Sequence, residues 1–485
     1  MARDTSEPPQ STEPPQPPRS SERPAPSSTS SPAEAQDVGA NRRAQLARTL
    51  AHHRGRAHFL HAPRFLRILG PGLITGAADD DPSGIGAYSQ TGAAYGPALL
   101  WTALYLFPLM VATQEMCGRI GLVTRQGLAG VIRKHYSRRL LIGAVLLLFV
   151  ANTINVAADL GAMTAAIRLI VPRAPTVPLL VLIALGVLLL EVFVPYRVYA
   201  QALKVLALSL LAYVITGFII GGDWRQLLLS TLIPHVEFTS EYLTLLVALI
   251  GTTISPYLFF WQASEEVEEE QKTHRLHEGR PLWQTRALKL KLKRLRVDTI
   301  MGMLAAEITF WFIIQTTAGT LHVHNITNIQ TAAQAAQALE PFVQGLPNAG
   351  FIAKTIFALG IVGTGLLAVP VLAGSAAYGV AEAFGWREGL SKVVTHARGF
   401  YGVIAASTLI GLALNFSGVN PITGLIYAAV INAIVAVPLL ALILRVANNR
   451  AIMGDFVNSR RSNIIGYITL TGMALAATVA IISLL

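Results

Sequence analysis

Long apolar runs alternate with short, charged connections along most of this chain. Windows of about 20 apolar residues, enough for a helix to cross a bilayer, recur throughout. They lie near residues 68–94, 98–121, 140–169, 176–195, 199–221, 241–263, 298–319, 347–383, 398–416, 421–445 and 464–484. Because the runs are continuous, helices are favoured over a membrane β-barrel. The pattern predicts an all-α polytopic membrane protein with about 11 transmembrane helices.

The composition supports this class. Of the 485 residues, 53% are hydrophobic and only 13% are charged, with a mean hydropathy of +0.51. Soluble proteins carry about 25% charged residues. The net charge of +11 does not indicate a nucleic-acid partner, because Lys and Arg lie between the apolar runs and in the N-terminal segment. The lipid bilayer is therefore the expected surrounding.

Residues 1–60 differ from the rest of the chain. They are rich in Pro, Ser, Glu and Gln and contain almost no large apolar residues before Phe59. Such a segment cannot bury enough surface to fold, so we expect a disordered cytoplasmic tail at 1–60, followed by one transmembrane domain at 61–485. The tail lacks the apolar core of a signal peptide.

Basic residues give the expected orientation. They gather after the second, sixth, eighth and tenth windows, within 119–139, 272–296, 387–398 and 445–461. The connection at 415–421, on the opposite side, has no Lys or Arg. Cytoplasmic loops carry the excess of positive charge, so the N-terminus is expected inside and the C-terminus outside the inner or plasma membrane. Residues 265–296 are expected to form a solvated, charged loop.

The first window is interrupted by acids and a proline. Three consecutive carboxylates, Asp79 to Asp81, stand inside an apolar run and would be costly unless they face protein, water or a cation. Pro82 removes a backbone donor and Gly84 relaxes the chain, so the helix should break just after Asp81. A broken helix frees carbonyl oxygens beside a carboxylate, as in a cation site, although a simple proline kink remains the alternative.

The sixth window has a matching interruption. Pro256 follows a stretch rich in small hydroxyl residues, Gly251-Thr-Thr-Ile-Ser255. Two proline-broken spans in equivalent places are the signature of an inverted-repeat transporter with five helices in each half, whose broken centres meet near the midplane. We therefore predict one carboxylate and several neutral oxygens around a metal cation. The predicted metal-site residues are Asp81, Gly84, Ala78, Thr252 and Ser255.

Several segments resemble the Nramp family over nearly the whole chain after the tail. They are Gly70-Pro-Gly72, Asp81-Pro-Ser-Gly84, the stretch 114–124, Ala158-Asp-Leu160 and Met453-Gly454. The resemblance implies a LeuT-like 5+5 inverted repeat with helices 1 and 6 broken, and divalent metal transport. It implies a metal ion as substrate and no resident cofactor.

The sequence departs from the family pattern at the ligands. The family's Met-Pro-His in the sixth span is Ser255-Pro256-Tyr257 here, its first-span Asn is Gly84, and Ala429 stands where the tenth span would offer Gln. Loss of the soft thioether removes discrimination against hard ions, and a wider site suits an ion that keeps its waters. The chain thus resembles the magnesium-transporting branch of the family.

The sequence also gives weaker support for proton coupling than the family pattern does. The family's His is Tyr257, and the third-span acid one turn beyond Asp159 is Ala162. A divalent cation moving inward gains about 4–5 kcal/mol per 100 mV of membrane potential without any proton. The residues expected to line the pathway or support the ligands are Asp80, Asp159, Tyr257 and Asn432.

The preferred function is transport of hard divalent cations, Mg²⁺ and also Mn²⁺, without strict proton coupling. A proton-coupled Mn²⁺ or Fe²⁺ importer is the alternative within the class. An amino-acid permease is opposed by Asp81, which would repel a substrate carboxylate, and a metal sensor remains as a non-transporting alternative. No nucleophile triad or phosphate loop is present, so we expect no enzyme. The expected partners are the metal ion and the bilayer, and the expected state is a monomer.

Overall fold

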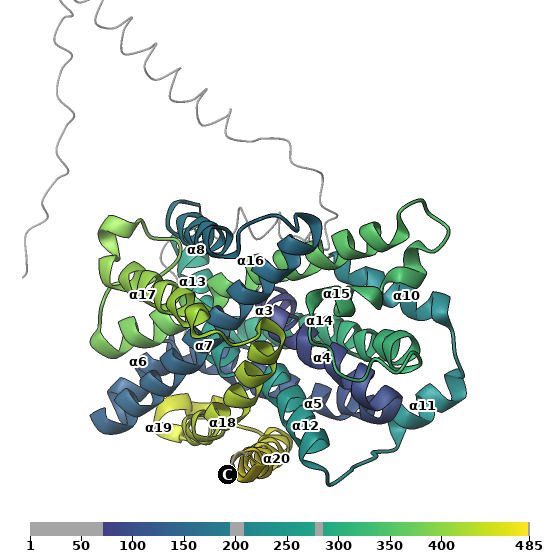
Figure 1. The fold of residues 1–485 in the computed structure, drawn as a ribbon. Coiled ribbons are helices and arrows are strands. Elements are labelled where there is room, and N and C mark those ends of the chain that lie inside the picture. The colour runs from purple at the N-terminus through teal and green to yellow at the C-terminus, as the bar shows by residue number, and fades with distance from the viewer. Residues whose placement is uncertain (1–70, 195–207, 277–284, 484–485) are drawn as a thin grey trace, which may run out of the picture. The chain divides into compact units, whose positions relative to one another are not determined.

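Helices form nearly all of the chain that the computed structural model describes, residues 71–194, 208–276 and 285–483 (Figure 1). These ranges contain no β-strand, so the predicted all-α class is confirmed. The predicted tail at 1–60 lies outside the described residues, as do 195–207 of the fifth window and 277–284 of the charged connection.

The α-helices are α3 (Pro71–Asp79), α4 (Pro82–Tyr95), α5 (Trp101–Thr124), α6 (Leu128–His135), α7 (Arg138–Ile170), α8 (Thr176–Phe193), α10 (Leu211–Ile220), α11 (Trp224–Leu232), α12 (Ser240–Thr253), α13 (Pro256–Leu276), α14 (Thr285–Thr317), α15 (Ala332–Gln337), α16 (Ala349–Phe384), α17 (Arg398–Leu414), α18 (Pro421–Ala447), α19 (Arg450–Met453) and α20 (Arg460–Ser483). Short 3₁₀ turns cover Gly96–Leu99, Leu208–Leu210, Glu340–Val343, Val394–His396, Asn415–Ser417 and Gly454–Phe456, and Ala318–His322 is a π-helical turn.

Eight helical segments among the described residues are long and apolar enough to cross a bilayer, with α12 and α13 counted together. The helices α4 and α5 pass the same test only as a pair, bent by 107°. With α3 and α4 as the first span, α5 as the second and α10 as the described end of the fifth, every one of the eleven predicted windows has a helical counterpart.

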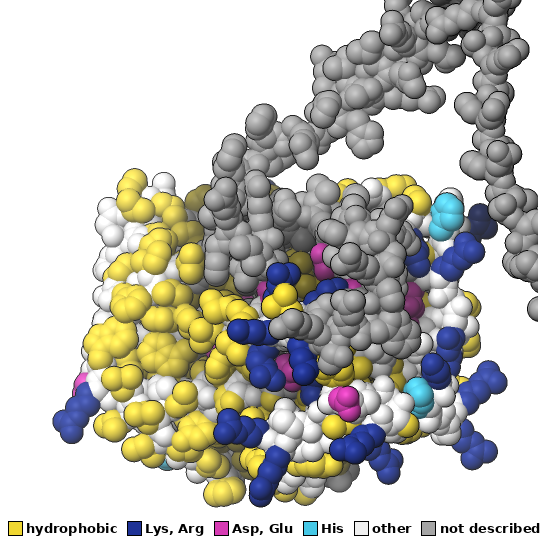
Figure 2. All heavy atoms as spheres, turned by 180° about the vertical axis from the view of Figure 1, so that it is seen from behind, with side chains coloured by type: hydrophobic (Ala, Val, Ile, Leu, Met, Phe, Trp, Pro, Cys, Tyr) yellow, Lys and Arg dark blue, Asp and Glu magenta, His cyan; other side chains and the backbone are white. Residues whose placement is uncertain are grey.

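Large apolar side chains cover the outer faces of these helices. Phe193 on α8 is 75% exposed, and Leu475 on α20 is 64% exposed, although both stand in apolar helices. Figure 2 shows apolar side chains over a broad part of one face, with Lys and Arg gathered elsewhere on it. Exposed apolar surface of this extent suits a protein whose surrounding solvent is lipid.

The broken first span lies among the longest helices. The helices α3 and α4 pack along α14, α7 packs along α16 and α18, and α12 packs along α18 (Figure 1). The N–H of Gly72 donates to Asp298 Oδ2 at 2.7 Å, which ties the start of α3 to α14. A Cβ on Gly251 of α12 would lie 2.0 Å from the carbonyl oxygen of Ala429 on α18. These two helices therefore meet backbone to backbone.

The expectation of a loop at 265–296 is wrong for both of its described parts, because 265–276 continue α13 and 285–296 belong to α14. Residues Glu265 to Glu270 continue α13, and Glu268 is only 7% exposed. Its carboxylate accepts hydrogen bonds from the hydroxyl of Tyr378 at 2.6 Å and from the N–H groups of Leu390 and Ser391 at 3.1 and 3.0 Å. The glutamates are buried because α16 and the connection after it supply donors that no local pattern reveals.

The first span breaks slightly earlier than predicted. The helix α3 ends at Asp79 and α4 begins at Pro82, so the break covers Asp80 and Asp81 rather than following Asp81. Proline lacks the N–H that the first helical residue does not need and has a helical φ, so Pro82 starts the second half-helix. The sixth span breaks as predicted, with Ile254 and Ser255 between α12 and Pro256.

Candidate cation site

The two helix breaks lie against each other. The hydroxyl oxygens of Ser83 on α4 and Thr252 on α12 are 3.4 Å apart. On the other side of the breaks, the hydroxyl of Tyr257 on α13 donates to the carbonyl oxygen of Ala78 on α3 at 2.8 Å. All four half-helices therefore meet at one buried place, as expected when both breaks face each other.

Asp81 stands at the centre of this place and has one oxygen left unused. Its Oδ1 accepts hydrogen bonds from the Ser83 hydroxyl and from the Gly84 N–H, both at 2.7 Å, which makes Asp81 the N-cap of α4. Its Oδ2 is buried and has no hydrogen-bond partner. The cap fixes the carboxylate at the positive end of the helix, and the second oxygen remains open to a cation.

The neutral oxygens of the predicted site are close to one another. The Ser255 hydroxyl shares its proton between the carbonyl oxygens of Gly251 and Thr252, at 2.8 and 2.6 Å. The Thr252 carbonyl is the one that Pro256, four residues later, leaves without an N–H donor. The lone pairs of the Ser255 hydroxyl remain available. Thr252, Ser255 and Ala78 are 1% exposed or less. Hydroxyl and carbonyl oxygens of this kind are hard ligands.

Tyr257 connects the two broken spans. Its hydroxyl bonds to Ala78, and its own carbonyl oxygen accepts a hydrogen bond from the Ser375 hydroxyl of α16 at 2.7 Å. The phenol of Tyr257 also interacts electrostatically with the carboxyl group of Asp81. Tyr257 thus lies at the site, where it holds α3 against α13.

The other pathway candidates occupy different positions. Asp159 on α7 is completely buried, neither of its oxygens has a hydrogen-bond partner, and it interacts electrostatically with Asp81. Asn432 on α18 exchanges two hydrogen bonds with Asn155 on α7, at 2.8 and 3.1 Å. The side chain of Asn432 therefore joins two long helices instead of pointing free into the site.

Asp80 belongs to a second group of acids. Asp80 and Asp79 both interact electrostatically with Glu307 of α14. Both oxygens of Glu307 and one oxygen each of Asp79 and Asp80 are buried without a hydrogen-bond partner. Asp80 lies in the break beside Asp81 and also interacts with it electrostatically.

The donor set around Asp81 limits how a metal could be held. Within the described parts of the chain, no three His, Cys, Asp or Glu side chains are grouped so that they could hold a metal ion. A cation at the two breaks would have one carboxylate oxygen, neutral hydroxyl and carbonyl oxygens, and water. This arrangement suits an ion that keeps part of its hydration shell.

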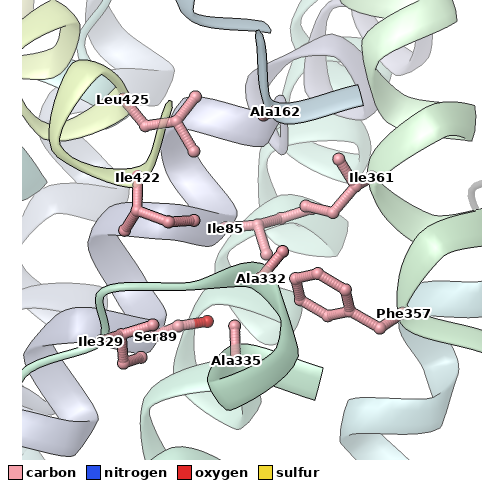
Figure 3. A pocket seen from close by; sticks show the side chains of 11 residues that line it. Ile85, Ser89, Ala162, Ile329, Ala332, Ala335, Phe357, Ile361, Ile422 and Leu425 are labelled. Atoms are coloured by element: carbon pink, nitrogen blue, oxygen red, sulfur yellow. The ribbon is translucent and has the colours of Figure 1, made fainter. Parts of the chain in front are cut away.

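An apolar pocket lies next to the site along α4. Its lining comes from α4, α7, α15, α16 and α18, and Ser89 is its one hydroxyl-bearing residue. Figure 3 shows Ile85 in the middle of the pocket, with Ile361 and Phe357 on one side and Leu425 on the other. Ala162, where the family resemblance would place an acid, lines this pocket.

A segment after α14 covers the pocket. The side chain of Gln90 donates to the carbonyl oxygen of Thr327 at 3.0 Å and accepts from the N–H of Ile329 at 2.8 Å. Ile329, Ala332 and Ala335 of the segment line the pocket. In this conformation the segment therefore closes the pocket with apolar side chains.

Sequence reasoning missed Ser83, Tyr88 and Asn155. Ser83 lies in the first turn of α4 and was an available signal, because a hydroxyl two residues after an N-cap Asp often bonds to it. Tyr88 lies one helical turn after Gly84, on the same face of α4. Asn155 gave no signal, because an isolated amide in an apolar run does not reveal its partner.

The fold and the site together define a polytopic α-helical transporter, with two broken spans that meet at a buried carboxylate. The profile of the Nramp family, described as "Natural resistance-associated macrophage protein-like", matches residues 72–483. The chain belongs to the Nramp family of metal transporters. In this family, which is not a class of enzymes, the metal ion is the substrate and not a cofactor.

Two relatives and two solved structures are similar over most of the chain. The divalent metal cation transporter MntH of Deinococcus radiodurans is 28% identical over 449 residues, which cover 87% of this chain and 91% of the relative. The MntH of Acidiphilium cryptum is 27% identical over 398 residues, covering 80% and 84%.

The structure of the Eremococcus coleocola manganese transporter in complex with an aromatic bis-isothiourea substituted compound has a TM-score of 0.67 at 16% identity, over 88% of this chain and 89% of that chain. MhsT in complex with L-phenylalanine has a TM-score of 0.54 at 12% identity, over 85% and 98%. At these identities both structures support the LeuT-like fold alone.

Proposed function

We propose that this protein carries hard divalent cations, Mg²⁺ and also Mn²⁺, across the cell membrane through the site at Asp81. The observation that supports the proposal best is the set of oxygens at the two breaks, which combines one open carboxylate oxygen with hydroxyl and carbonyl groups. Ser255 stands where a thioether ligand would favour softer transition metals. The proposed ligands are Asp81, Thr252, Ser255 and the carbonyl of Ala78, with Gly84 beside them.

Transport without strict proton coupling is part of the proposal. A tyrosine replaces an imidazole at position 257, and Ala162 places a methyl group in the apolar pocket where an acid would offer a proton site. The membrane potential alone favours inward movement of a divalent cation by about 4–5 kcal/mol per 100 mV. Asp159 supports the charge of the site, Tyr257 and Asn432 hold the surrounding helices in place, and Asp80 lines the pathway beside Asp81.

A proton-coupled Mn²⁺ importer is the second candidate. It is favoured by the names of the relatives, since both MntH proteins are called divalent metal cation transporters and the structural neighbour a manganese transporter. Mn²⁺ also accepts oxygen ligands, so the same donors would bind it. In that case Asp159, buried beside Asp81 and without hydrogen-bond partners, is the proposed proton acceptor.

The proposed orientation follows from the basic connections. Lys and Arg gather in the connections that contain Arg133, Arg387 and Arg450. Because positive loops stay in the cytoplasm, we place these connections and the N-terminus inside and the C-terminus outside, in a protein that acts as a monomer.

Flux into proteoliposomes tests the function. Purified protein is reconstituted with an internal pH dye, and uptake of Mg²⁺ and Mn²⁺ is followed under an imposed potential. We expect Mg²⁺ uptake without acidification, which is lost in Asp81→Asn and retained in part by the matched variant Asp159→Asn. Uptake of Mn²⁺ with acidification and no Mg²⁺ flux would refute transport of hard cations without proton coupling and support the second candidate. No uptake of either ion would refute both functions.

A further inference from the structure

The space that Gly84 leaves at the site is already occupied. A Cβ built on Gly84 would lie 3.2 Å from the hydroxyl oxygen and from the ring carbon Cε2 of Tyr88, and 3.2 Å from Oγ1 of Thr252. The sequence led us to expect that glycine at position 84 widens the site. In this conformation the site is not wider, because Tyr88 and Thr252 fill the space. The phenol hydroxyl of Tyr88 reaches the place where a longer side chain at position 84 would lie.

The geometry of α4 explains how Tyr88 reaches this place. Side chains of a helix lean toward its N-terminus, so a residue covers the turn before its own Cα. Tyr88 follows Gly84 by four residues in α4, and its ring therefore lies over Gly84. The ring stacks on Phe310 of α14 with centroids 4.2 Å apart and an interplanar angle of 20°. A ring that is 1% exposed and stacked in this way holds its hydroxyl in a defined position.

The surroundings of the hydroxyl are acidic. Four carboxyl groups act electrostatically on Tyr88, those of Asp79, Asp80, Asp81 and Glu307. Buried groups of one sign are stabilised by a charge of the opposite sign, and in a cation transporter that charge is the substrate.

We propose that the Tyr88 hydroxyl is a cation-facing oxygen of the site, which takes the place of a side chain at position 84 and favours hydrated, hard cations. The inference rests on the proposed function and names a residue that determines its specificity. A rigid phenol can accept a hydrogen bond from a water bound to the ion. Mg²⁺ gives up its waters more reluctantly than Mn²⁺, so it depends on such an acceptor more than Mn²⁺ does.

Removal of one hydroxyl tests the inference. In Tyr88→Phe the ring and its stacking on Phe310 remain, and only the oxygen is lost. We expect the KM for Mg²⁺ uptake by proteoliposomes to rise about five- to tenfold, as for loss of one hydrogen bond, and the KM for Mn²⁺ to rise about twofold at most. The matched control is Tyr242→Phe, because Tyr242 is also fully buried but its hydroxyl bonds to the carbonyl oxygen of His235.

A second variant tests whether the hydroxyl occupies the space at position 84. We expect Gly84→Asn to reduce uptake strongly, because its Cβ alone would be 3.2 Å from the hydroxyl. The double variant Gly84→Asn/Tyr88→Phe should recover part of this loss, and more for Mn²⁺ than for Mg²⁺. Positive coupling between the two changes is not expected from a tyrosine that only fills space elsewhere.

The outcomes separate this inference from the proposed function. If Tyr88→Phe changes both KM values no more than Tyr242→Phe does, the Tyr88 hydroxyl does not face the ion and the inference is wrong. If the double variant is no better than Gly84→Asn alone, the inference is likewise wrong. If Asp81→Asn still transports Mg²⁺ normally, the proposed function itself fails, whatever Tyr88→Phe shows.

Discussion

Replacing Gly251 with alanine tests whether the backbone contact between α12 and α18 positions the site. The new Cβ would lie 2.0 Å from the carbonyl oxygen of Ala429 and 2.7 Å from the amide nitrogen of Ala433. Both atoms belong to the backbone of a long helix and cannot turn away. Ordinary contact begins near 3.4 Å, so α12 must move away from α18 by about 1.4 Å.

The expected cost follows from two opposing effects. Adding a methyl group to a packed core costs about 1–3 kcal/mol, and contact with rigid backbone places Gly251→Ala at the upper end. The higher helix propensity of alanine offsets about 1 kcal/mol of this cost. We therefore expect a net loss of about 2 kcal/mol in the free energy of unfolding. Because Thr252 moves with α12, its approach to Ser83 should also be lost, and metal uptake should fall.

Thermal unfolding of the purified protein in detergent measures this loss. The control is Gly186→Ala, since Gly186 also lies within a helix but its Cβ would have no neighbour within 4 Å. We expect the melting temperature to fall in Gly251→Ala and to stay constant or rise slightly in Gly186→Ala. Equal melting temperatures for the two variants, together with normal uptake in both, would refute the packing argument.

Two further predictions concern protons. Ala162→Glu puts an unpaired carboxyl group into the apolar pocket, one turn after Asp159. Metal uptake should then be accompanied by acidification of the vesicle. An unchanged signal from the pH dye would contradict this prediction. Burial, and then repulsion from Glu382, raises the pKa of Glu388 from 4.5 to about 9. Because the folded state keeps a proton that the unfolded state releases, the melting temperature should fall as pH rises from about 4.5 to about 9. Glu388→Gln should make this fall smaller. An identical pH profile in the variant would contradict the prediction.

The sequence by itself determined the class, the spans and the two breaks. Continuous apolar runs of sufficient length require helices in a bilayer, and intramembrane acids beside prolines are too costly to be incidental. These are properties of a few neighbouring residues, so Asp81, Thr252 and Ser255 could be singled out without a structure. The break was predicted to follow Asp81, whereas α3 already ends at Asp79, so that Asp80 and Asp81 form the break before Pro82 starts α4.

Only the tertiary structure decided how these residues serve the site. Ser83 meets Thr252 across 169 positions of sequence, and Tyr257 meets Ala78 across 179. The burial of Glu268 by donors beyond α16, and the position of the Tyr88 hydroxyl over Gly84, likewise depend on which helices pack together. Local pattern cannot show these contacts, because each partner is chosen by the folding of distant segments and by the space that their side chains leave.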